Sequence, residues 1–446
     1  MAHPYIPLTD DDRRAMLATV GVASVDELFA DLPAEHRDPP LDLPPALSEA
    51  ELLRELTELA ARSCSTDEQL SFLGAGAYRH YIPSVVDHII RRGEYLTAYT
   101  PYQPEISQGT LQTIFEFQSL VCELTGMDVA NAGMYDGASA LAEACLMACS
   151  VTGRARILVL DTVHPHAIDT VRTYAGGRDL AVEVVSAAEA KVGEDDACLA
   201  VQQPNFFGYM EELSTLGRAA HEAEALFVVS ADPVSLGLFR PPAAFDADIV
   251  VGEGQPLGVP LSFGGPYVGL FACRQRFVRH MPGRIVGRTH DLDGRTGYVL
   301  TLQTREQHIR RERATSNICT SQQLVALAFT VALCTLGKQG LRRMAELCYH
   351  KAHYAAERIA GLPGYDLPLG GVASAGSGQS FFQEFVVRCP ASSGGPSEVN
   401  RRLLEQGIVG GLDVSDRIER GLLLCFSELH TREEIDRLVQ PLEELR

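Results

Sequence analysis

Five short apolar segments lie between residues 156 and 272: RILVL (156–160), CLAVQ (198–202), LFVVS (226–230), DIVV (248–251) and VGLFA (268–272). Each has the length of a buried strand, and stretches with helical character, such as 134–149 and 211–224, precede or separate them. This alternation predicts a mostly parallel sheet with helices on both faces. The chain is therefore expected to be an α/β protein that binds ligands at the C-terminal ends of its strands.

Downstream of this region the pattern changes. FFQEFVVRC (381–389), GIVGGLDV (407–414) and GLLLCFSE (421–428) are typical of strands, and SEVNRRLLEQ and TREEIDRLVQPLEEL are typical of helices. These elements predict a small C-terminal α+β domain. The predicted division is an N-terminal extension and arm over 1–110, a large α/β domain over 111–340 and the small domain over 341–446.

The first 60 residues are rich in proline and contain little regular structure. Ser48 is placed to cap a helix in SEAELLRELTELAARS, and the spacing of four leucines predicts that this helix packs on a core through Leu52, Leu53, Leu56 and Leu59. Further on, FLGAGAY places Gly74 and Gly76 in a tight turn where the backbone passes close to another group. His80 follows this turn, and a structural role and a site role are equally compatible with its position.

The segment YLTAYTPYQPEISQG (95–109) fits neither a helix nor a strand period. Pro101 and Pro104 fix their own backbone and drive the preceding residues into extended conformation. The result is a stiff, irregular arm that displays aromatic and polar side chains. An ordinary proline-rich loop has the same composition, so composition alone does not assign the arm a function.

Composition limits the kinds of partner. The chain of 446 residues has 38 Lys and Arg against 58 Asp and Glu, a net charge of −20, which argues against nucleic acid and anionic membranes. No apolar run is expected to reach membrane-spanning length, and the N-terminus lacks the pattern of a signal peptide. The 11 cysteines include no CxxC pair, so buried thiols in a reducing cytoplasm and no metal site are expected.

The run TAYTPYQPEISQG resembles the glycine dehydrogenase (decarboxylating) family, the P-protein of the glycine cleavage system. Other runs carry the same resemblance: FLGAGAYRHYIPSVV, FQSLVCELTGMDVANAGMYDGASALAEA, MPGRIVG and LQTREQHIRRERATSNICTSQQ. They match the N-terminal half of the long single-chain enzymes, which is a separate subunit 1 in split systems. The resemblance implies an aspartate-aminotransferase-like fold, fold type I of the enzymes that depend on pyridoxal phosphate.

Pyridoxal phosphate needs a lysine for its Schiff base, an acid for its ring nitrogen and a cradle for its phosphate. Asp232 stands where the family fold places the acid, and Ser139 stands at a helix start that fits either a phosphate site or, preferably, a cap. The chain has only three lysines, and none follows a buried strand beyond Asp232. Gln255 occupies the lysine position counted back from GGP, and an amide cannot form an imine. The pocket is therefore expected to be vestigial.

The resemblance implies that a companion chain, subunit 2, binds the cofactor, in an α2β2 assembly that decarboxylates glycine and transfers the aminomethyl group to the lipoyl group of the H-protein. The contribution expected from this chain is a shared site at the subunit interface. The candidate residues are Tyr99, Thr100, Tyr102, Gln103, Glu105 and Ser107 of the arm, with Asn317 and Thr320 after a basic helix predicted over 302–313. Two rival interpretations remain, an autonomous pyridoxal-phosphate decarboxylase or desulfurase and a purely structural subunit.

Overall fold

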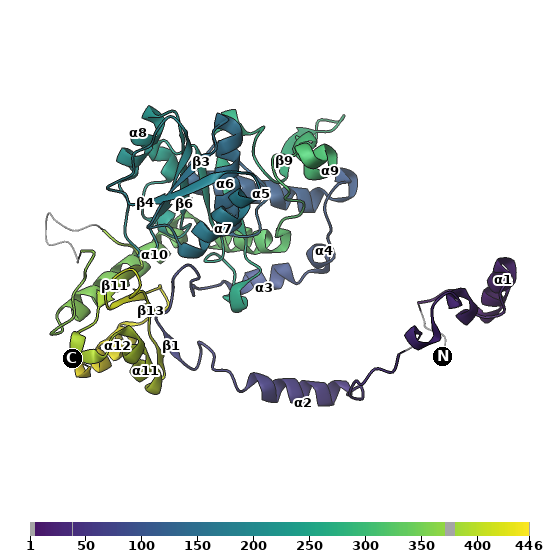
Figure 1. Cartoon of the computed structure of the whole chain (residues 1–446), viewed down its shortest axis with the longest axis horizontal. Helices are drawn as coiled ribbons and strands as arrows, with labels where there is room; N and C mark the ends of the chain where they lie inside the picture. Colours follow the sequence, from purple (N-terminus) through teal and green to yellow (C-terminus); the bar gives the residue numbers. More distant parts are fainter. Residues whose placement is uncertain (1–4, 38, 371–379, 446) are drawn as a thin grey trace. The chain divides into compact units, whose positions relative to one another are not determined.

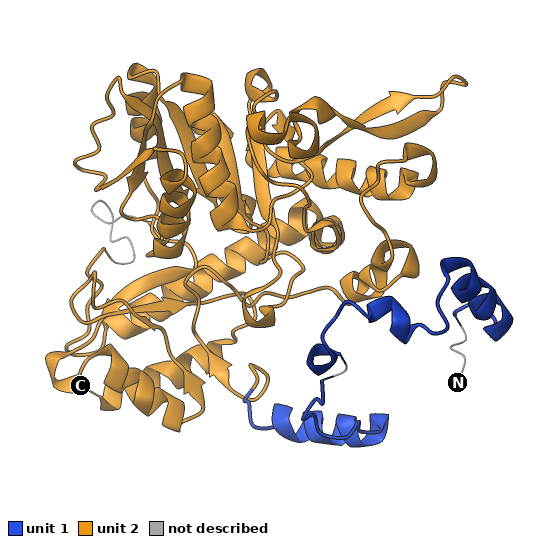
Figure 2. Cartoon of the chain, turned by 45° about the vertical axis from the view of Figure 1, so that its right-hand side comes forward, with its two compact units in different colours: residues 1–64 blue, residues 65–446 orange. Residues whose placement is uncertain are grey.

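The computed structural model describes residues 5–37, 39–370 and 380–445. The chain forms two compact units, Met1–Cys64 and Ser65–Arg446 (Figure 2). Unit 1 contains helices α1 (Asp10–Val20) and α2 (Glu49–Ala60), and the Ser48 side chain caps α2 in a reciprocal pair with Glu51. No described residue of unit 1 is buried. The expected core packing of α2 is therefore wrong, because its leucines are 46% to 59% exposed: Leu52, Leu53, Leu56 and Leu59.

Unit 2 is built on a seven-stranded sheet with the order β2-β8-β7-β6-β5-β3-β4. Figure 1 labels β3, β4 and β6 of this sheet. Strands β4, β3, β5, β6 and β7 are parallel neighbours, while β8 runs antiparallel to both β7 and β2. All five predicted strands are present, so the mostly parallel α/β sheet is confirmed. The strand bounds are β2 Val129–Ala130, β3 Arg156–Leu160, β4 Ala181–Val185, β5 Asp196–Gln203, β6 Leu226–Ala231, β7 Ile249–Glu253 and β8 Gly269–Cys273.

Helices pack against this sheet and link its strands. Helix α6 packs on α7 and on strands from β5 to β8, and α8 packs on β5 and β6. Helix α6 begins at Gly137, later than the sequence predicts, because Met134 pairs with Gly269 and Asp136 caps the helix. The helix bounds here are α3 Ser84–Ile90, α4 Gly93–Leu96, α5 Gln108–Thr125, α6 Gly137–Thr152, α7 Pro165–Gly176 and α8 Leu213–Glu222.

The C-terminal part forms a second, smaller layer with its own core. Strand β14 (Gly421–Cys425) lies between β11 (Glu384–Arg388) and β13 (Leu412–Asp413), and both neighbours are antiparallel to it. Helices α11 (Pro396–Glu405) and α12 (Arg432–Glu444) contribute Leu403, Ile435 and Leu438 to the core. The predicted α+β character of this region is confirmed. The short β1 (Leu70–Ser71) pairs with β12 (Ile408–Val409), which joins the segment before the arm to this layer.

The segment predicted as one basic helix is broken instead. A hairpin of β9 (Ile285–His290) and β10 (Thr296–Thr301) precedes it. Two single turns of 3-10 helix then flank α9, which spans only Gln307–Arg310. The break falls at Arg311, whose φ of 53° is incompatible with a continuous right-handed helix. The prediction of a basic helix over 302–313 is therefore wrong.

Helix α10 (Gln323–Ala360) is the long connector between the two layers of unit 2. It meets the length and hydropathy of a membrane-spanning helix, which the sequence analysis did not anticipate. Its apolar residues have another explanation, because Phe329, Ala345 and Cys348 are fully buried in the core. The helix is also kinked at Gly337, where φ is 62° and ψ is −178°.

Candidate functional site: an internal pocket and an exposed arm

A pocket of about 400 Å³ lies where the parallel strands end. The turns after β3, β5, β6 and β7 and the start of α6 all contribute to it, which is the usual position of a ligand site in a parallel sheet. The Gly74–Tyr78 segment and the beginning of β11 close it. Its lining includes the predicted Asp232 and, in addition, Tyr78, Asp136, His164, Glu253, Gln383 and Glu384.

Gln255 stands in the sequence between the lining residues Glu253 and Pro256 and is 1% exposed. Its side-chain oxygen accepts the Tyr78 N–H at 2.9 Å, and its nitrogen donates to the carbonyls of Tyr78 at 2.8 Å and Val259 at 2.9 Å. The amide therefore holds the backbone of the 74–78 segment in place. Every strong hydrogen-bonding direction of the side chain except one acceptor lone pair is used, so Gln255 is a structural clamp.

The Gly74–Tyr78 segment needs its glycines for this close approach. A Cβ at Gly74 would lie 2.6 Å from the Cβ of Cys425, and Gly76 has a φ of 105° beside the His164 ring. The prediction that the backbone passes close to another group here is confirmed. Glu384 fixes the same segment, because it accepts the Ala75 N–H and the Tyr78 hydroxyl, both at 2.6 Å.

A carboxylate occupies the helix start where a phosphate would bind. Glu253 accepts the N–H of Gly137 at 2.8 Å and of Gln255 at 3.1 Å, and burial raises its pKa to about 7. Asp136 and Ser139 form a reciprocal cap on the same helix, the arrangement that the sequence favours. The partial positive charge of the α6 N-terminus is thus already opposed by acidic groups of the chain itself.

The Asp232 side chain likewise accepts hydrogen bonds from the turn that follows it. It accepts the N–H of Val234 at 2.7 Å and of Ser235 at 2.9 Å, and Gln383 donates to it at 3.3 Å. Burial raises the pKa of Asp232 and raises that of Glu384 to about 7. Burial also lowers the pKa of His164, which keeps that imidazole neutral.

These residues do not fit pyridoxal phosphate. The described lining contains no lysine or arginine, whereas it contains four carboxyl groups: Asp136, Asp232, Glu253 and Glu384. A phosphate dianion would be repelled there, and no amine is placed to form an imine.

The arm contrasts with the pocket because it faces outward. Tyr99 is 81% exposed, Tyr102 46% and Ile106 80%, while Pro101 is buried beneath them. Its C-terminal end is held by Gln108, whose amide exchanges two hydrogen bonds of 2.9 Å with the backbone of Tyr298 in β10. The arm therefore presents a surface of apolar and aromatic side chains from a fixed base.

Tyr102 is the arm residue that the rest of unit 2 positions most directly. Arg284 donates to its hydroxyl at 2.9 Å and lies over its ring, and the His308 ring meets it edge to face. Glu306 Oε2 lies 3.5 Å from Arg284 Nε and 3.5 Å from His308 Nδ1, at ion-pair distance but without a hydrogen bond to Arg284 Nε. Arg284 and Glu306 are each 9% exposed, and within the described structure Glu306 Oε1 has no hydrogen-bond partner.

The remaining predicted site residues are exposed or partly exposed. Gln103 and Glu105 are exposed on the arm, Thr100 accepts the Tyr102 N–H through its carbonyl at 2.9 Å, and Ser107 precedes α5. Asn317 and Thr320 are exposed on the loop before α10. Among the described residues, no hydrogen bond or ring contact joins Asn317 or Thr320 to the arm. Their neighbours Ser316 and Ile318 line a small cavity with Arg284 and Glu306, the residues beside Tyr102.

Sequence reasoning missed several residues that shape these two regions. Glu253 and Glu384 look like ordinary strand-end acids, and only the fold places them in the pocket. Arg284 lies in MPGRIVG, one of the runs that carry the family resemblance, so this run could have indicated Arg284 as a candidate site residue. His80 is buried, and its Nδ1 forms a hydrogen bond of 2.6 Å with Glu428. Glu428 belongs to neither the pocket lining nor the arm.

Solved structures of similar shape identify the class. The crystal structure of glycine decarboxylase (P-protein) of the glycine cleavage system in inhibitor-bound form aligns with a TM-score of 0.90 and 43% identity, covering 100% of each chain. A sphingosine-1-phosphate lyase of Burkholderia pseudomallei aligns with a TM-score of 0.63 at 16% identity over 93% of this chain and 94% of its own, a likeness of fold alone. The chain thus has the fold of type I pyridoxal-phosphate enzymes.

Sequence comparison then gives the family. Residues 3–442 match the model of the glycine cleavage system P-protein. A relative from Thermomicrobium roseum is 54% identical over 99% of both chains, and one from Geobacillus kaustophilus is 52% identical over 99% of both; each is named probable glycine dehydrogenase (decarboxylating) subunit 1. The chain belongs to the glycine cleavage system P-protein family.

Proposed function

We propose that this chain is the subunit without Schiff-base lysine of a glycine dehydrogenase (decarboxylating, aminomethyl-transferring). In this proposal it works in the cytoplasm with a subunit 2 that binds pyridoxal phosphate, in an α2β2 assembly. The assembly releases CO2 from glycine and transfers the aminomethyl group to the lipoyl group of the H-protein. The names of the relatives from Thermomicrobium roseum and Geobacillus kaustophilus support the assignment to subunit 1.

The geometry of Gln255 is the observation that carries the proposal. A single substitution to lysine would not restore an attachment site, because the amide already pairs with the backbone of Tyr78 and Val259. The cofactor therefore belongs to the partner, and this chain contributes through its surface.

The arm is the part of the chain suited to that contribution. When bound to the partner, the cofactor supplies a ring that delocalises the electrons left by the departing carboxylate. Tyr99 and Tyr102 would wall the partner's pocket and exclude water, while Gln103, Glu105 and Ser107 would offer hydrogen bonds to substrate or to residues around it. The buried Glu306 Oε1, without a partner in the described structure, supports the idea that another molecule completes this region.

Borohydride trapping tests where the cofactor is held. The purified chain, alone and mixed with subunit 2, is incubated with pyridoxal phosphate, reduced and weighed intact by mass spectrometry. We expect one specific adduct on subunit 2 and none on this chain. A stoichiometric adduct on Lys191, Lys338 or Lys351 would overturn the proposal and favour an autonomous enzyme.

A purely structural subunit is the remaining rival. It predicts the same labelling result, because it also places the cofactor on the partner. Substitutions on the arm separate the two, since only a shared site loses catalytic rate while the assembly stays intact.

A further inference from the structure

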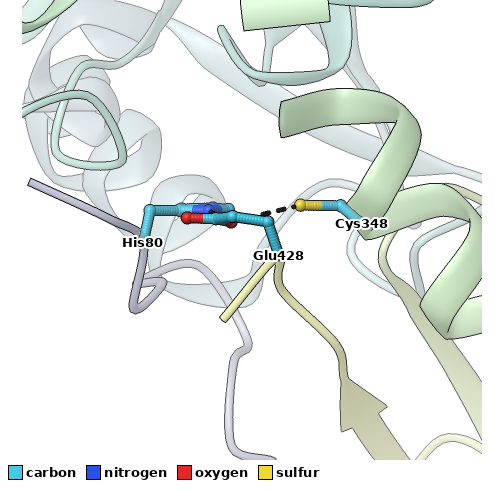
Figure 3. Close-up of side chains that lie close together, drawn as sticks. All are labelled: His80, Cys348 and Glu428. Carbon is cyan, nitrogen blue, oxygen red and sulfur yellow. Dashed lines mark hydrogen bonds and ion pairs between the residues drawn. The ribbon is translucent and has the colours of Figure 1, made fainter. Parts of the chain in front are cut away.

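Three metal-ligating side chains from distant parts of the chain meet in the interior of unit 2 (Figure 3). His80 lies between β1 and α3, Cys348 lies on α10, and Glu428 follows β14. His80 and Glu428 are 348 positions apart in the sequence. No local motif could therefore reveal this group, and the sequence analysis accordingly expected no metal site.

The ligand atoms already stand close to a shared centre. Glu428 Oε2 lies 2.6 Å from His80 Nδ1 and 3.4 Å from Cys348 Sγ, and the three atoms are all within 4.8 Å of one another. In a tetrahedral zinc site, bond lengths of about 2.0 Å to nitrogen and oxygen and about 2.3 Å to sulfur separate the ligands by about 3.3 to 3.5 Å. The sulfur–oxygen distance fits as it stands, and the nitrogen–oxygen pair needs to open by about 0.7 Å.

The three groups are also shielded from water. The side chains of His80 and Glu428 are 1% and 9% exposed, and Cys348 is fully buried. The second ring nitrogen of His80, Nε2, is buried and has no hydrogen-bond partner among the described residues. Because the ion would bind at Nδ1, the observation that supports it is the joint burial of the three ligand atoms rather than the unpaired Nε2.

The charges around the group favour a cation. Asp232 interacts electrostatically with both His80 and Cys348, and Glu384 carries a third carboxyl group nearby. The amine of Lys351, which donates to the Glu428 carbonyl at 2.5 Å, is the opposing positive charge on this side. Burial raises the pKa of Asp232 and of Glu384, so the carboxylate that a divalent ion would balance is that of Glu428.

We propose that His80, Cys348 and Glu428 bind one divalent transition-metal ion of the Zn²⁺ or Co²⁺ type. Thiolate and imidazole ligands select such ions, whereas Mg²⁺ and Ca²⁺ require six or more oxygen ligands. The ion would take the place of the shared hydrogen bonds, with His80 Nδ1, Cys348 Sγ and a Glu428 oxygen as ligands.

Binding has a defined proton balance. The Cys348 thiol loses its proton to solvent and binds as thiolate, while Glu428 is already a carboxylate, since its pairing with His80 lowers its pKa. His80 binds through the lone pair of Nδ1, so a proton carried by that nitrogen moves to Nε2 or leaves to solvent. Binding one ion therefore releases at least one proton, that of the thiol.

The consequence would be structural. The ion would join the segment that leads to the arm, the connector α10 and the C-terminal layer, three parts that are distant in sequence. Binding to the folded chain alone would raise its resistance to unfolding by mass action.

Cobalt titration tests the site. The full-length chain, reduced, stripped with a chelator and carrying serine at the exposed Cys64, Cys319 and Cys334, is titrated with Co²⁺. We expect a thiolate-to-cobalt absorption band that saturates at one equivalent and disappears on addition of Zn²⁺. Calorimetry in buffers of different ionisation enthalpy should report release of at least one proton.

Variants assign the ligands. Cys348→Ala should abolish the band, whereas Cys273→Ala, a matched change at another buried cysteine, should keep it. Glu428→Gln, which preserves size and a hydrogen-bond acceptor for His80, should weaken binding at least about tenfold, and it serves if Cys348→Ala fails to fold. The proposal is overturned if the parent binds no cobalt at one equivalent, or if the band survives in Cys348→Ala.

Discussion

Glutamine and glutamate side chains occur both at the internal pocket and on the exposed arm. They form hydrogen bonds within the chain at the pocket, whereas on the arm they are exposed. In the pocket, the carboxyl and amide groups of Glu253 and Gln255 are engaged with backbone of the same chain. On the arm, Gln103 and Glu105 face outward, and Tyr99 is 81% exposed. Groups that satisfy one another stabilise a fold, whereas groups left open can serve a partner.

This difference indicates separate roles for the two regions. The pocket lies at the strand ends, and its polar groups fix the 74–78 segment. The arm, outside the sheet, keeps a rigid base through Gln108 and through the contact of Tyr102 with Arg284. We therefore expect changes in the pocket to affect stability and changes in the arm to affect catalysis.

Combined substitution of Tyr102→Ala and Glu105→Gln should produce the largest effect. We expect the rate of glycine decarboxylation by the assembly with subunit 2 to fall about 10³-fold, equivalent to about 4 kcal/mol of barrier, through loss of positioning and of water exclusion. The measurement is exchange of labelled CO2 into glycine, with assembly followed by size-exclusion chromatography.

The matched control for the arm is Tyr81→Ala, because Tyr81 is also exposed, at 55%, but lies outside the arm. An unchanged rate in the double variant, with assembly intact, would favour the purely structural subunit and remove the proposed shared site.

The pH dependence of stability should reveal the buried acid of the pocket. Burial raises the pKa of Glu253 from 4.5 to about 7, so the folded chain holds this proton more tightly than the unfolded chain. Its stabilising contribution is complete below pH 4.5 and is lost as the pH rises through about 7, a change of up to about 3 kcal/mol.

Urea unfolding of the wild type and of Glu253→Gln between pH 5 and pH 8 measures this contribution. The variant cannot ionise at this position, so its curve should lack the fall that Glu253 contributes. A constant offset from the altered hydrogen bonds does not affect this comparison. Parallel curves would contradict the assignment.

Two glutamines offer a direct test of the contrast between the regions. Gln255→Ala removes three hydrogen bonds to buried backbone and should lower the free energy of unfolding by about 2 kcal/mol, with water from the adjacent pocket limiting the loss. Gln103→Ala, at an exposed position, should change it by less than about 0.5 kcal/mol. Equal effects on stability would remove the distinction.

The sequence predicted the sheet well because its signal is local. Runs such as LFVVS at β6 and DIVV at β7 are short and largely apolar, so these strands can be predicted without knowledge of any tertiary contact. The small number of lysines is visible in the sequence for a similar reason, while the placing of Gln255 at the lysine position stays a prediction. The clamp that Gln255 forms with Tyr78 could not be predicted, because the two residues are 177 positions apart.

Other features depend on contacts that no local pattern contains. Arg311 interrupts the predicted basic helix through its positive φ, although its neighbours have good helix propensity. Arg284 precedes β9 and Glu306 follows β10, so the β9–β10 hairpin brings these two residues together beside Tyr102. The cysteines show the same limit, since seven are buried as expected but Cys64, Cys319 and Cys334 are exposed.

The smallest effect is expected at the apolar face of α2. The sequence predicted this helix correctly, but its predicted packing on a core is wrong. Leu53 and Leu56 are 59% and 52% exposed, so burial in this chain does not explain their spacing. Leu53→Glu with Leu56→Glu should therefore change the free energy of unfolding of the isolated chain by less than about 0.5 kcal/mol. Leu403→Ala on α11, a fully buried leucine, should cost about 2 to 5 kcal/mol in the same urea titration. A comparable loss in the α2 variant would show that its leucines are buried within the chain after all, and the sequence-based expectation of core packing would be restored.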